Sequence, residues 1–421
     1  MKILYLSQYF PPEMGAPAAR ASELSRYWVR DCHDVTVLTG FPNHPTGVVP
    51  REYRPKMWRL SIREKSDGVN VVRTWLLPFP NRKAYERMLN YSSFCISSAI
   101  AGLRLAPHDV VIASSPQLLV GLSGWWLARC KGSRFVFEVR DLWPESMAAV
   151  GMGGRDSLLH RSLSRIAGFL YRTSDHIVVV TRAFKDYLVE YWHVPPEKIS
   201  VVENGVETNV FYPHGESAAL RERLGLAGKF VVSYIGTIGM AHGLETLIEA
   251  AVLLQNSSPE VSFLIVGEGA EKEHIVSLAA SRNLSNIIFR DQQPREIIPT
   301  YISASDACLV LLKKSELFKT VIPSKMLEFM ACARPVILGV EGQAKQILDK
   351  AGAGVCFSPE NAMELAGAAI YLASRPVLRE SLGRNGRSHI VKYSSRHRTA
   401  EQYLGVLERV LKSGVEESAA A

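Results

Sequence analysis

The feature that most limits the fold is an alternation of short β-branched runs with helix-length stretches, and it occurs twice. In the first half the runs are "KILYLS", "DVTVLT", "VNVVRTW", "DVVIASS", "RFVFEVR" and "HIVVVT". In the second half they are "FVVSYIG", "VSFLIVG", "NIIFRD", "ACLVLL", "PVILGV" and "GVCFS". Apolar strands that alternate with helices form parallel sheets covered on both faces. The sequence therefore predicts an α/β protein with two doubly wound parallel-sheet domains.

The segment "ISVVENGVETNVFYP" separates the two sets of runs. It begins with a further strand, and Asn204-Gly205 is a turn signal after that strand. A chain of 421 residues also exceeds the size at which one hydrophobic core stops growing. We therefore expect domains over residues 1–204 and 205–393, with a helix over 394–413 that packs back on the first domain. In such sheets ligands bind at the carboxyl ends of the strands, which predicts a site in an interdomain cleft.

The net charge of +8 belongs to the first half of the chain. Residues 1–204 hold 26 Lys and Arg against 18 Asp and Glu, whereas residues 205–421 hold 23 of each sign. This asymmetry suggests an anionic partner, either lipid headgroups or nucleic acid, and the alternative is a solvated basic face. The basic residues form no aromatic-interleaved groove pattern, so we expect no nucleic-acid partner.

The stretch from 81 to 105 combines basic residues, among them Arg82, Lys83 and Arg87, with aromatic and aliphatic residues at helical spacing. This combination suits a helix that lies on an anionic membrane surface. The alternative is an ordinary amphipathic helix that covers the sheet. No apolar stretch approaches the roughly 20 residues that a membrane-spanning helix needs.

The cysteines and the amino-terminal residues indicate a cytoplasmic protein. Six cysteines lie far apart, and none forms a Cys-x-x-Cys pair, which is typical of reduced thiols. The opening "MKILYLSQYF" lacks a small-residue cleavage site and is interpreted as a first strand.

Glycine-bearing loops follow several of the expected strands. Gly15 precedes a helix near residue 16, where backbone N–H groups could meet an anion. Gly236 and Gly239 lie in "YIGTIGMAHGLETLIEAA", and three glycines there favour a phosphate contact over a simple turn. His242 of that loop could donate to a phosphate, or could simply be solvated. Gly267 lies in "IVGEGAEK", but no strand is followed by Gly-x-Gly-x-x-Gly, which argues against a dinucleotide-dependent dehydrogenase.

The segment "VIPSKMLEFMACARPVI" places a carboxylate, Glu328, inside an apolar helical run. Pro323 and Ser324 predict the helix start with Ser324 as N-cap, so that Glu328 comes one position too late for a capping box. An unpaired buried carboxylate is costly, so we expect Glu328 to bind ligand hydroxyls such as a ribose diol, with Lys325 meeting a diphosphate. The alternative is a structural ion pair with Arg334 or another cation.

Polar residues also follow other strands. Arg140, Asp141 and Glu145 in "FEVRDLWPES" resemble a site more than a core. Asn43 and His44 in "TGFPNHPTG" could meet an acceptor, although a plain Pro-rich turn is the alternative. A further loop, "FRDQQPRE", could contact a base, and it holds Arg290 and Asp291. Because no Asp-x-Asp occurs, we expect no metal ion and no cofactor.

Together these motifs resemble the family 4 retaining glycosyltransferases, which have the GT-B fold. The matching segments span nearly the whole chain: "PPEMGAP", "DVTVLTGFPNHPTG", "RDLWPES", "VVENGVETNVFYP", "YIGTIGMAHGLETLIEAA", "VGEGAE" and "PSKMLEFMACARPVI". The nearest branch is similar to the bacterial O-antigen and capsule fucosaminyltransferases. The resemblance implies that the first domain binds the acceptor and the second binds a nucleotide sugar.

The chain departs from the family pattern at a few positions. The family has two glutamates eight apart, of which the second matches Glu328 and the first is Thr320 here. The Arg and Lys of the family's glycine loop are replaced by Thr237 and His242, which leaves Lys325 as the expected phosphate cation. A catalytic His-Asp pair of the family is Arg140-Asp141 here.

The resemblance implies transfer of a sugar, UDP-linked and possibly an N-acetylated amino sugar, to a polyprenyl-diphosphate-linked saccharide. The enzyme would work at the inner face of the plasma membrane. Arg140, Asp141, Lys325 and Glu328 would be catalytic, with Asn43, His44 and Glu145 at the acceptor. The donor would contact the glycine loops together with Arg290, Asp291, Thr320, Pro323 and Ser324. The alternatives are a catalytically silent nucleotide-sugar-binding subunit and a GT-B-type epimerase or phosphorylase.

Overall fold

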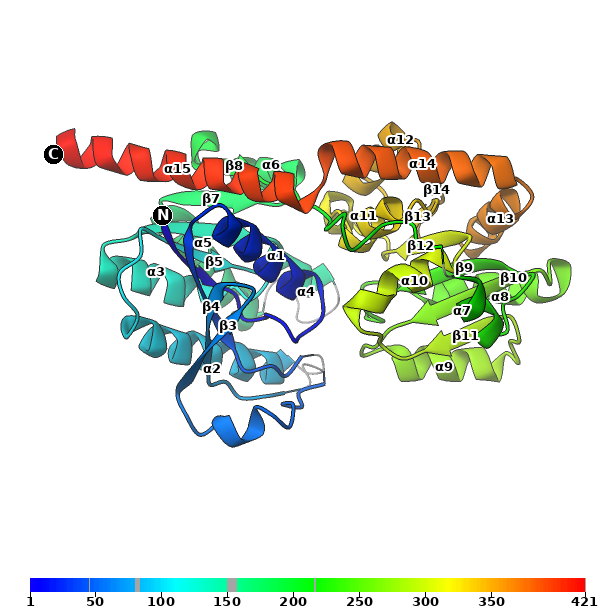
Figure 1. Ribbon diagram of the computed structural model, residues 1–421, viewed down its shortest axis with the longest axis horizontal. Coiled ribbons are helices and arrows are strands. Elements are labelled where there is room, and N and C mark those ends of the chain that lie inside the picture. Colours follow the sequence, from blue (N-terminus) through cyan, green and yellow to red (C-terminus); the bar gives the residue numbers. More distant parts are fainter. Residues whose placement is uncertain (45, 80–83, 150–156, 216, 421) are drawn as a thin grey trace. The chain divides into compact units, whose positions relative to one another are not determined.

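The protein divides into two compact units (Figure 1). The computed structural model describes residues 1–421 except 45, 80–83, 150–156, 216 and 421, so that Arg82 and Lys83 lie outside the described residues. The first unit comprises Met1–Asn204 and Arg396–Ala421, and the second comprises Gly205–Ser395. The carboxy-terminal helix therefore belongs to the first unit, and it begins at Arg396, two residues later than expected.

The first unit contains an eight-stranded sheet in the order β3-β4-β2-β1-β5-β6-β7-β8. Neighbouring strands are parallel except for β3 and β4, which form an antiparallel pair at one edge. Apart from exposed first residues, β1 and β2 are buried throughout, as expected for strands covered on both faces. The strands are β1 Lys2–Leu6, β2 Asp34–Gly40, β3 Ser61–Ser66, β4 Val69–Thr74, β5 Val110–Ser114, β6 Arg134–Val139, β7 His176–Val179 and β8 Ile199–Val201.

The helices of this unit pack in two groups. The first helix, α1, contacts β2 and α15, whereas α3 contacts β5, β6, α2 and α5. The indole Nε1 of Trp28 donates to the carbonyl of Ala400 at 3.2 Å, which joins α1 to the returning helix. The helices are α1 Ala16–Arg30, η1 Arg54–Lys56, α2 Ala84–Leu103, α3 Val120–Lys131, α4 Glu145–Ala149, α5 Leu158–Thr173, α6 Arg182–Glu190, η2 Pro196–Lys198 and α15 Arg396–Ala420.

The second unit contains a six-stranded, wholly parallel sheet in the order β11-β10-β9-β12-β13-β14. Every residue of β9, β10 and β12 is buried. The strands are β9 Phe230–Ile235, β10 Val261–Val266, β11 Ile287–Arg290, β12 Ala307–Leu311, β13 Val336–Gly339 and β14 Gly354–Cys356. The helices are α7 Ala218–Arg223, α8 Glu245–Ser257, α9 Lys272–Ser281, η3 Arg295–Ile297, α10 Ile298–Ser303, η4 Leu317–Thr320, α11 Ser324–Ala331, α12 Gln343–Ala351, α13 Ala362–Ala373 and α14 Pro376–Tyr393.

The two doubly wound parallel-sheet units confirm the predicted fold class, but one strand was missed. β3 has the sequence "SIREKS", whose residues are half-buried or exposed, so it lacks the apolar run that marks the other strands. A strand at the edge of a sheet can carry charged residues because only one side of it is covered. Among the described residues no helix is long and apolar enough to cross a bilayer.

A buried ion pair holds the centre of the first unit together. Arg20 of α1 and Glu138 of β6 are fully buried, and Nε of Arg20 lies 2.9 Å from the Glu138 carboxylate. Tyr5 also donates to Glu138, at 2.8 Å. The Arg20 guanidinium donates in addition to the carbonyl of Val202 at 3.1 Å and to Oδ1 of Asn204 at 3.0 Å. One side chain thus ties α1 to β6 and to the last residues of the unit's first segment.

We expect Arg20→Met to lower the free energy of unfolding of the first unit by about 3–5 kcal/mol, because Glu138 loses its buried cation. All seven tryptophans lie in residues 1–204, so denaturant unfolding followed by tryptophan fluorescence reports on this unit. The control is Arg26→Met, since Arg26 is partly exposed and 3.7 Å from Asp67. It should lower the free energy by about 1 kcal/mol or less. Equal losses in both variants would contradict the central role of Arg20.

Candidate donor and acceptor sites

Two glycine loops of the second unit approach each other at the carboxyl ends of β9 and β10. Gly267 has a φ of +157°, and a Cβ atom on it would lie 1.9 Å from the carbonyl oxygen of Gly236. Gly236 itself has a φ of +141°, and a Cβ atom there would lie 2.9 Å from Nζ of Lys325. Side chains at either position would separate the loops or displace the ammonium. The glycines are therefore required for backbone to reach backbone beside a cation.

Lys325, the second residue of α11, places its ammonium next to this loop pair. Its Nζ lies 3.9 Å from the ring centroid of Tyr234, a buried residue of β9. The Nζ atom is buried and has no hydrogen-bond partner. An ammonium has three donors, so this one has a capacity for hydrogen bonds that the protein itself does not fill.

Burial also governs the protonation of this loop. Removal from water lowers the pKa of Lys325 to about 7, although the Glu328 carboxylate opposes the shift. Burial, with the Lys325 charge adding to it, lowers the pKa of His242 to about 3. His242 is thus a neutral imidazole at pH 7, and its Nδ1 lies 3.3 Å from the carbonyl of Gly239. Of Lys325 and His242, Lys325 is therefore the residue that can carry a positive charge beside the two glycine loops.

Glu328 is half-buried and forms an ion pair with Arg295 of η3, at 3.2 Å between Nη1 and Oε1. The guanidinium of Arg295 also stacks over the ring of Phe211, 4.9 Å from its centroid. Arg334, the partner suggested by the sequence, instead donates to the carbonyl of Ser303 at 2.7 Å. The structure thus supplies a cation for Glu328, but from a loop 33 residues earlier in the chain.

The start of α11 differs from the sequence expectation. The N-cap is Pro323, the helix begins at Ser324, and no side chain caps it, so the prediction of Ser324 as N-cap is wrong. A proline at the N-cap holds an extended φ and ψ without a side-chain hydrogen bond. Thr320 ends η4, and its hydroxyl donates within its own turn to the carbonyl of Leu317 at 2.6 Å.

Arg290 is the last residue of β11, and Asp291 follows it. The carbonyl of Arg290 accepts from the N–H of Gly267 at 3.1 Å. Arg290 is exposed, and its guanidinium donates to the carbonyl of Phe289 at 3.0 Å. Asp291 is largely exposed and pairs with Lys272 of α9 at 2.5 Å. The Arg290 side chain is engaged with β11 and that of Asp291 with α9, and their predicted contact with a base remains a prediction.

In the first unit, Arg140 and Asp141 follow β6. Nη2 of Arg140 donates to the carbonyl of Ala16 at the start of α1, at 3.1 Å, and Gly15 is the N-cap of that helix. The Nε and Nη1 atoms of Arg140 are buried without hydrogen-bond partners. Burial lowers the pKa of Arg140 to about 10 and raises the pKa of Asp141 to about 6. Asp141 also accepts from the indole of Trp143 at 3.2 Å.

The predicted acceptor residues are held by the protein's own hydrogen bonds. The Asn43 amide donates to the carbonyl of Phe41 at 3.0 Å and accepts from Asn90 at 3.3 Å, and Asn43 is buried. Glu145 accepts from the hydroxyl of Tyr187 at 2.8 Å. His44 is half-buried, and its ring lies 4.8 Å from that of Tyr9. Of these predicted residues, Asn43 has hydrogen bonds at both its amide nitrogen and its amide oxygen, which fits a structural role.

The structure brings together Gly236, Gly239, His242, Gly267 and Lys325, with Glu328 one turn along α11. The carbonyl of Thr237 joins them by accepting from the hydroxyl of Tyr234 at 2.6 Å. The sequence did not predict roles for Tyr234, Arg295 or the buried carboxylate of Glu13. Arg295 lies in the quoted "FRDQQPRE" loop, where its position before an apolar turn was the available signal.

One group of side chains among the described residues could offer ligands to a metal ion. Glu245, Glu271 and His274 have ligand atoms within 4.8 Å of one another. His274 is exposed and the glutamates are half-buried, an arrangement that solvated side chains also adopt.

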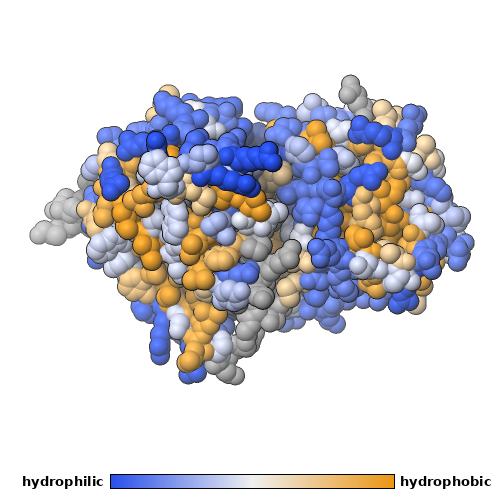
Figure 2. Space-filling model, turned by 90° about the horizontal axis from the view of Figure 1, so that it is seen from below, coloured by the Kyte–Doolittle hydropathy of each residue, from blue (hydrophilic) through white to orange (hydrophobic). Residues whose placement is uncertain are grey.

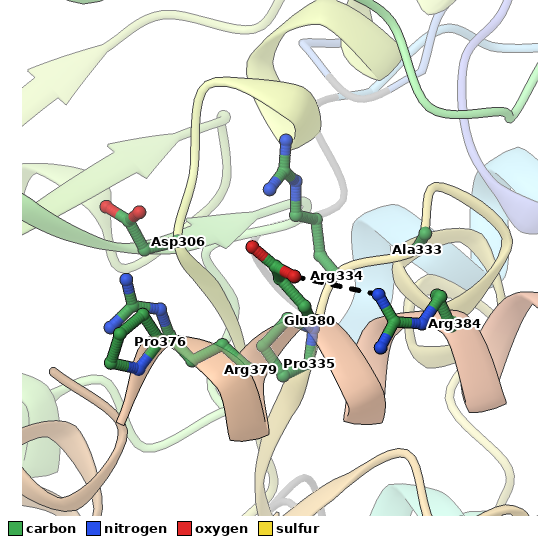
Figure 3. A pocket seen from close by; sticks show the side chains of 8 residues that line it. All are labelled: Asp306, Ala333, Arg334, Pro335, Pro376, Arg379, Glu380 and Arg384. Carbon is green, nitrogen blue, oxygen red and sulfur yellow. Dashed lines mark ion pairs between the residues drawn. The ribbon is translucent and has the colours of Figure 1, made fainter. Parts of the chain in front are cut away.

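A cavity of about 330 Å³ lies at the opposite end of the strands, where Asp306 precedes β12 and Pro335 precedes β13. Its arginines do not converge on one point (Figure 3). Arg384 pairs with Glu380 at 3.6 Å, and Arg379 donates to carbonyls at the end of α13. We therefore do not assign the donor to this cavity.

Comparisons with known proteins agree with the two-unit arrangement. The glycosyl transferase 4-like domain matches residues 15–205, and the glycosyl transferases group 1 domain matches residues 216–389. The chain is 27% identical over 375 residues to the putative colanic acid biosynthesis glycosyl transferase WcaI of Escherichia coli (strain K12), and 86% of this chain and 89% of the relative are covered.

Solved structures share the fold at low identity. Sucrose-phosphate synthase (tll1590) from Thermosynechococcus elongatus superposes with a TM-score of 0.76 at 19% identity, over 98% of this chain and 99% of that one. Anabaena Alr3699/HepE in complex with UDP-glucose gives a TM-score of 0.72 at 16% identity, over 97% and 100% of the two chains. With its two parallel-sheet units and its two matched domains, the chain belongs to the GT-B glycosyltransferases.

Proposed function

We propose that this glycosyltransferase moves a sugar from a UDP-linked donor, an N-acetylated amino sugar, to a polyprenyl-diphosphate-linked saccharide, with retention of configuration and without a metal ion. The name of the relative WcaI supports a role in surface polysaccharide assembly, and the UDP-glucose complex of HepE supports the donor class. The resemblance to the fucosaminyltransferase branch supports the amino sugar and the lipid-linked acceptor.

The observation that carries the proposal is the buried, unpartnered ammonium of Lys325 beside Gly236. A diphosphate placed there would fill its hydrogen-bonding capacity and supply the missing counter-charge. Negative charge grows on the diphosphate as the bond to the sugar breaks. Stabilisation by Lys325 is then greater in the transition state than in the bound substrate, which makes it a catalytic contribution.

Glu328 would accept hydrogen bonds from the ribose hydroxyls of the donor. A carboxylate accepts about four hydrogen bonds, so an ion pair with Arg295 is compatible with ribose binding. Arg295, held against Phe211, would fix the direction of the carboxylate. In the first unit, Arg140 would present the N–H groups of Nε and Nη1, which lack hydrogen-bond partners, to an anionic group of the substrates.

The alternative is a subunit that binds nucleotide sugar and transfers nothing. Thr320 favours it, because its hydroxyl is engaged within its own turn and cannot replace a carboxylate. Such a subunit would bind UDP yet release no product when donor and acceptor are supplied together.

The direct test is calorimetric binding of UDP, GDP, ADP and CMP without added metal. We expect UDP to bind most tightly and Glu328→Ala to weaken it about ten- to hundredfold, the size of losing hydrogen bonds to a charged group. Glu316→Ala is the matched control, because Glu316 is exposed on the same segment and pairs with Lys319 at 2.6 Å. If Glu328→Ala binds like the wild type, Glu328 serves only its ion pair with Arg295.

The lowered pKa of Lys325 predicts that UDP binding is coupled to proton uptake. This pKa of about 7, lowered by burial, should rise when a diphosphate binds, so the site should take up about one proton per UDP at pH 8. The affinity should accordingly fall as the pH increases above 7. Calorimetry in buffers of different ionisation enthalpy measures the uptake, and Lys325→Met should abolish it, whereas Lys319→Met should not. Binding of UDP with no proton uptake at pH 8 would contradict a diphosphate contact by Lys325.

The lipid-linked acceptor also requires contact with a membrane, and we assign this to the outer face of α2. Tyr85, Leu89, Ile96 and Ile100 of this helix are exposed, as is Trp126 of the neighbouring α3. Exposed Arg104 and Arg129 flank them. Hydrophobic side chains are visible on the side of the first unit viewed in Figure 2. Apolar side chains with basic neighbours suit an anionic bilayer surface.

The double variant Ile96→Glu and Ile100→Glu should reduce binding to phosphatidylglycerol vesicles about tenfold, because two charges replace apolar groups in contact with lipid. Co-sedimentation with the vesicles measures binding, and phosphatidylcholine vesicles test the need for anionic lipid. The control variant is Val377→Glu, which changes an exposed residue of the second unit. Equal binding of both variants would exclude this face.

A further inference from the structure

Glu13 is a buried carboxylate that the proposed transfer does not use. It lies in the loop between β1 and α1, between Pro12 and Met14, and is 7% exposed. Its backbone N–H donates to the carbonyl of Phe10 at 3.2 Å. Burying a carboxylate costs free energy unless it accepts hydrogen bonds. The hydrogen-bond partners of Glu13 therefore indicate its structural role.

The partners are backbone groups of a different loop. One oxygen of Glu13 accepts from the N–H of Asn43 and from the N–H of His44, both at 2.9 Å. The other oxygen lies 3.4 Å from the N–H of Phe10. The carboxylate therefore clamps the loop that follows β2 to the loop that follows β1, at the carboxyl edge of the sheet.

Hydrogen bonds from Asn90 also fix the loop after β2. Asn90 of α2 donates to Asn43 at 3.3 Å and to the carbonyl of Leu77 at 2.6 Å, and it accepts from Gln8 at 2.5 Å. These bonds fix the Asn43 side chain, whereas the adjacent His44 has its backbone held by Glu13 and its ring packed near Tyr9. Of the two residues of this loop whose N–H groups Glu13 binds, His44 is the one whose side chain can meet an acceptor hydroxyl.

We propose that Glu13 is a positioning residue, which fixes His44 for contact with the acceptor by clamping the loop after β2. The acceptor part rests on the proposed function, but the clamp does not. Because the hydrogen-bond partners of Glu13 among the described residues are main-chain N–H groups, a neutral isostere keeps the volume and weakens the clamp. The loss should appear in acceptor binding and leave the donor site of the second unit unchanged.

The charges around the clamp give it a dependence on pH. Burial raises the pKa of Glu13 to about 7, while the N–H groups of Asn43, His44 and Phe10, and the charge of Arg73, hold it from rising further. Tyr9 also faces Glu13, and burial raises the pKa of its hydroxyl well above its usual value, so it stays neutral. Because ionised carboxylates accept stronger hydrogen bonds, the clamp should tighten as the pH increases through 7.

The experiment is amide hydrogen exchange of the Asn43 and His44 N–H groups at pH 8, where Glu13 is ionised, in the wild type and in Glu13→Gln. Loss of the charged acceptor should speed the exchange of both N–H groups about tenfold. Glu23→Gln is the matched control, because Glu23 is also buried, on α1, but pairs with Arg396 at 2.7 Å. Unchanged exchange in Glu13→Gln, or the same change in Glu23→Gln, overturns the clamp.

Transfer rates test the acceptor part. With UDP-N-acetylglucosamine and undecaprenyl-diphosphate-linked N-acetylglucosamine as probes, Glu13→Gln should raise the KM for the acceptor about tenfold and leave the KM for the donor unchanged. The acceptor KM of the wild type should fall between pH 6 and 8, and that of the variant should not. If the exchange of the two N–H groups changes but the acceptor KM does not, the acceptor role is overturned. If the wild type transfers no sugar from any UDP-linked donor, the proposed function fails while the hydrogen exchange still decides the clamp.

Discussion

The cost of taking charge out of water shapes both sheet edges of this protein. In the second unit, the Lys325 ammonium is buried against Tyr234 and Gly236 with no hydrogen-bond partner, which lowers its pKa to about 7. An ion pair inside the protein would relieve that cost and would also remove the attraction for a ligand. The unpaired state keeps the electrostatic energy available for a diphosphate, at the expense of stability in the empty protein.

In the first unit, by contrast, the buried carboxylate of Glu138 is paired with cations. Burial would raise the pKa of Glu138, but the charges of Arg20 and Arg140 outweigh that effect and hold it below its usual value. Hydrogen bonds from Tyr5 and Ser114 complete the network. Such a satisfied cluster defines the position of β6 relative to α1. Arg140 follows β6, and two of its nitrogens, Nε and Nη1, have no hydrogen-bond partner, so the next residue after this cluster can still donate to a ligand.

The sequence predicted the fold well because most strands are apolar runs buried on both faces, a signal that each segment carries by itself. The sequence did not predict β3, because its polar residues fit a strand at the edge of the sheet. That position depends on pairing with β4 and cannot be recognised from the segment alone. The loop of Gly236 and the helix of Lys325 could be predicted from residues between strands. Arg295 could not, because its pairing with Glu328 depends on how a loop 33 residues earlier folds back. The role of Glu13 could not be predicted for a similar reason, since the two N–H groups at 2.9 Å from its carboxylate belong to the loop after β2.

Two ionisations near neutral pH act in opposite directions on the proposed reaction. Lys325 carries its charge below a pKa of about 7, so donor binding favours lower pH. Glu13 carries its charge above a pKa of about 7, so the acceptor clamp favours higher pH. Two groups of this kind give a bell-shaped profile for transfer, centred near neutrality. Bound diphosphate raises the pKa of Lys325, so saturation with donor should move the falling limb to higher pH and leave the limb set by Glu13 in place. The two limbs thereby separate the donor site from the acceptor loop within one measurement.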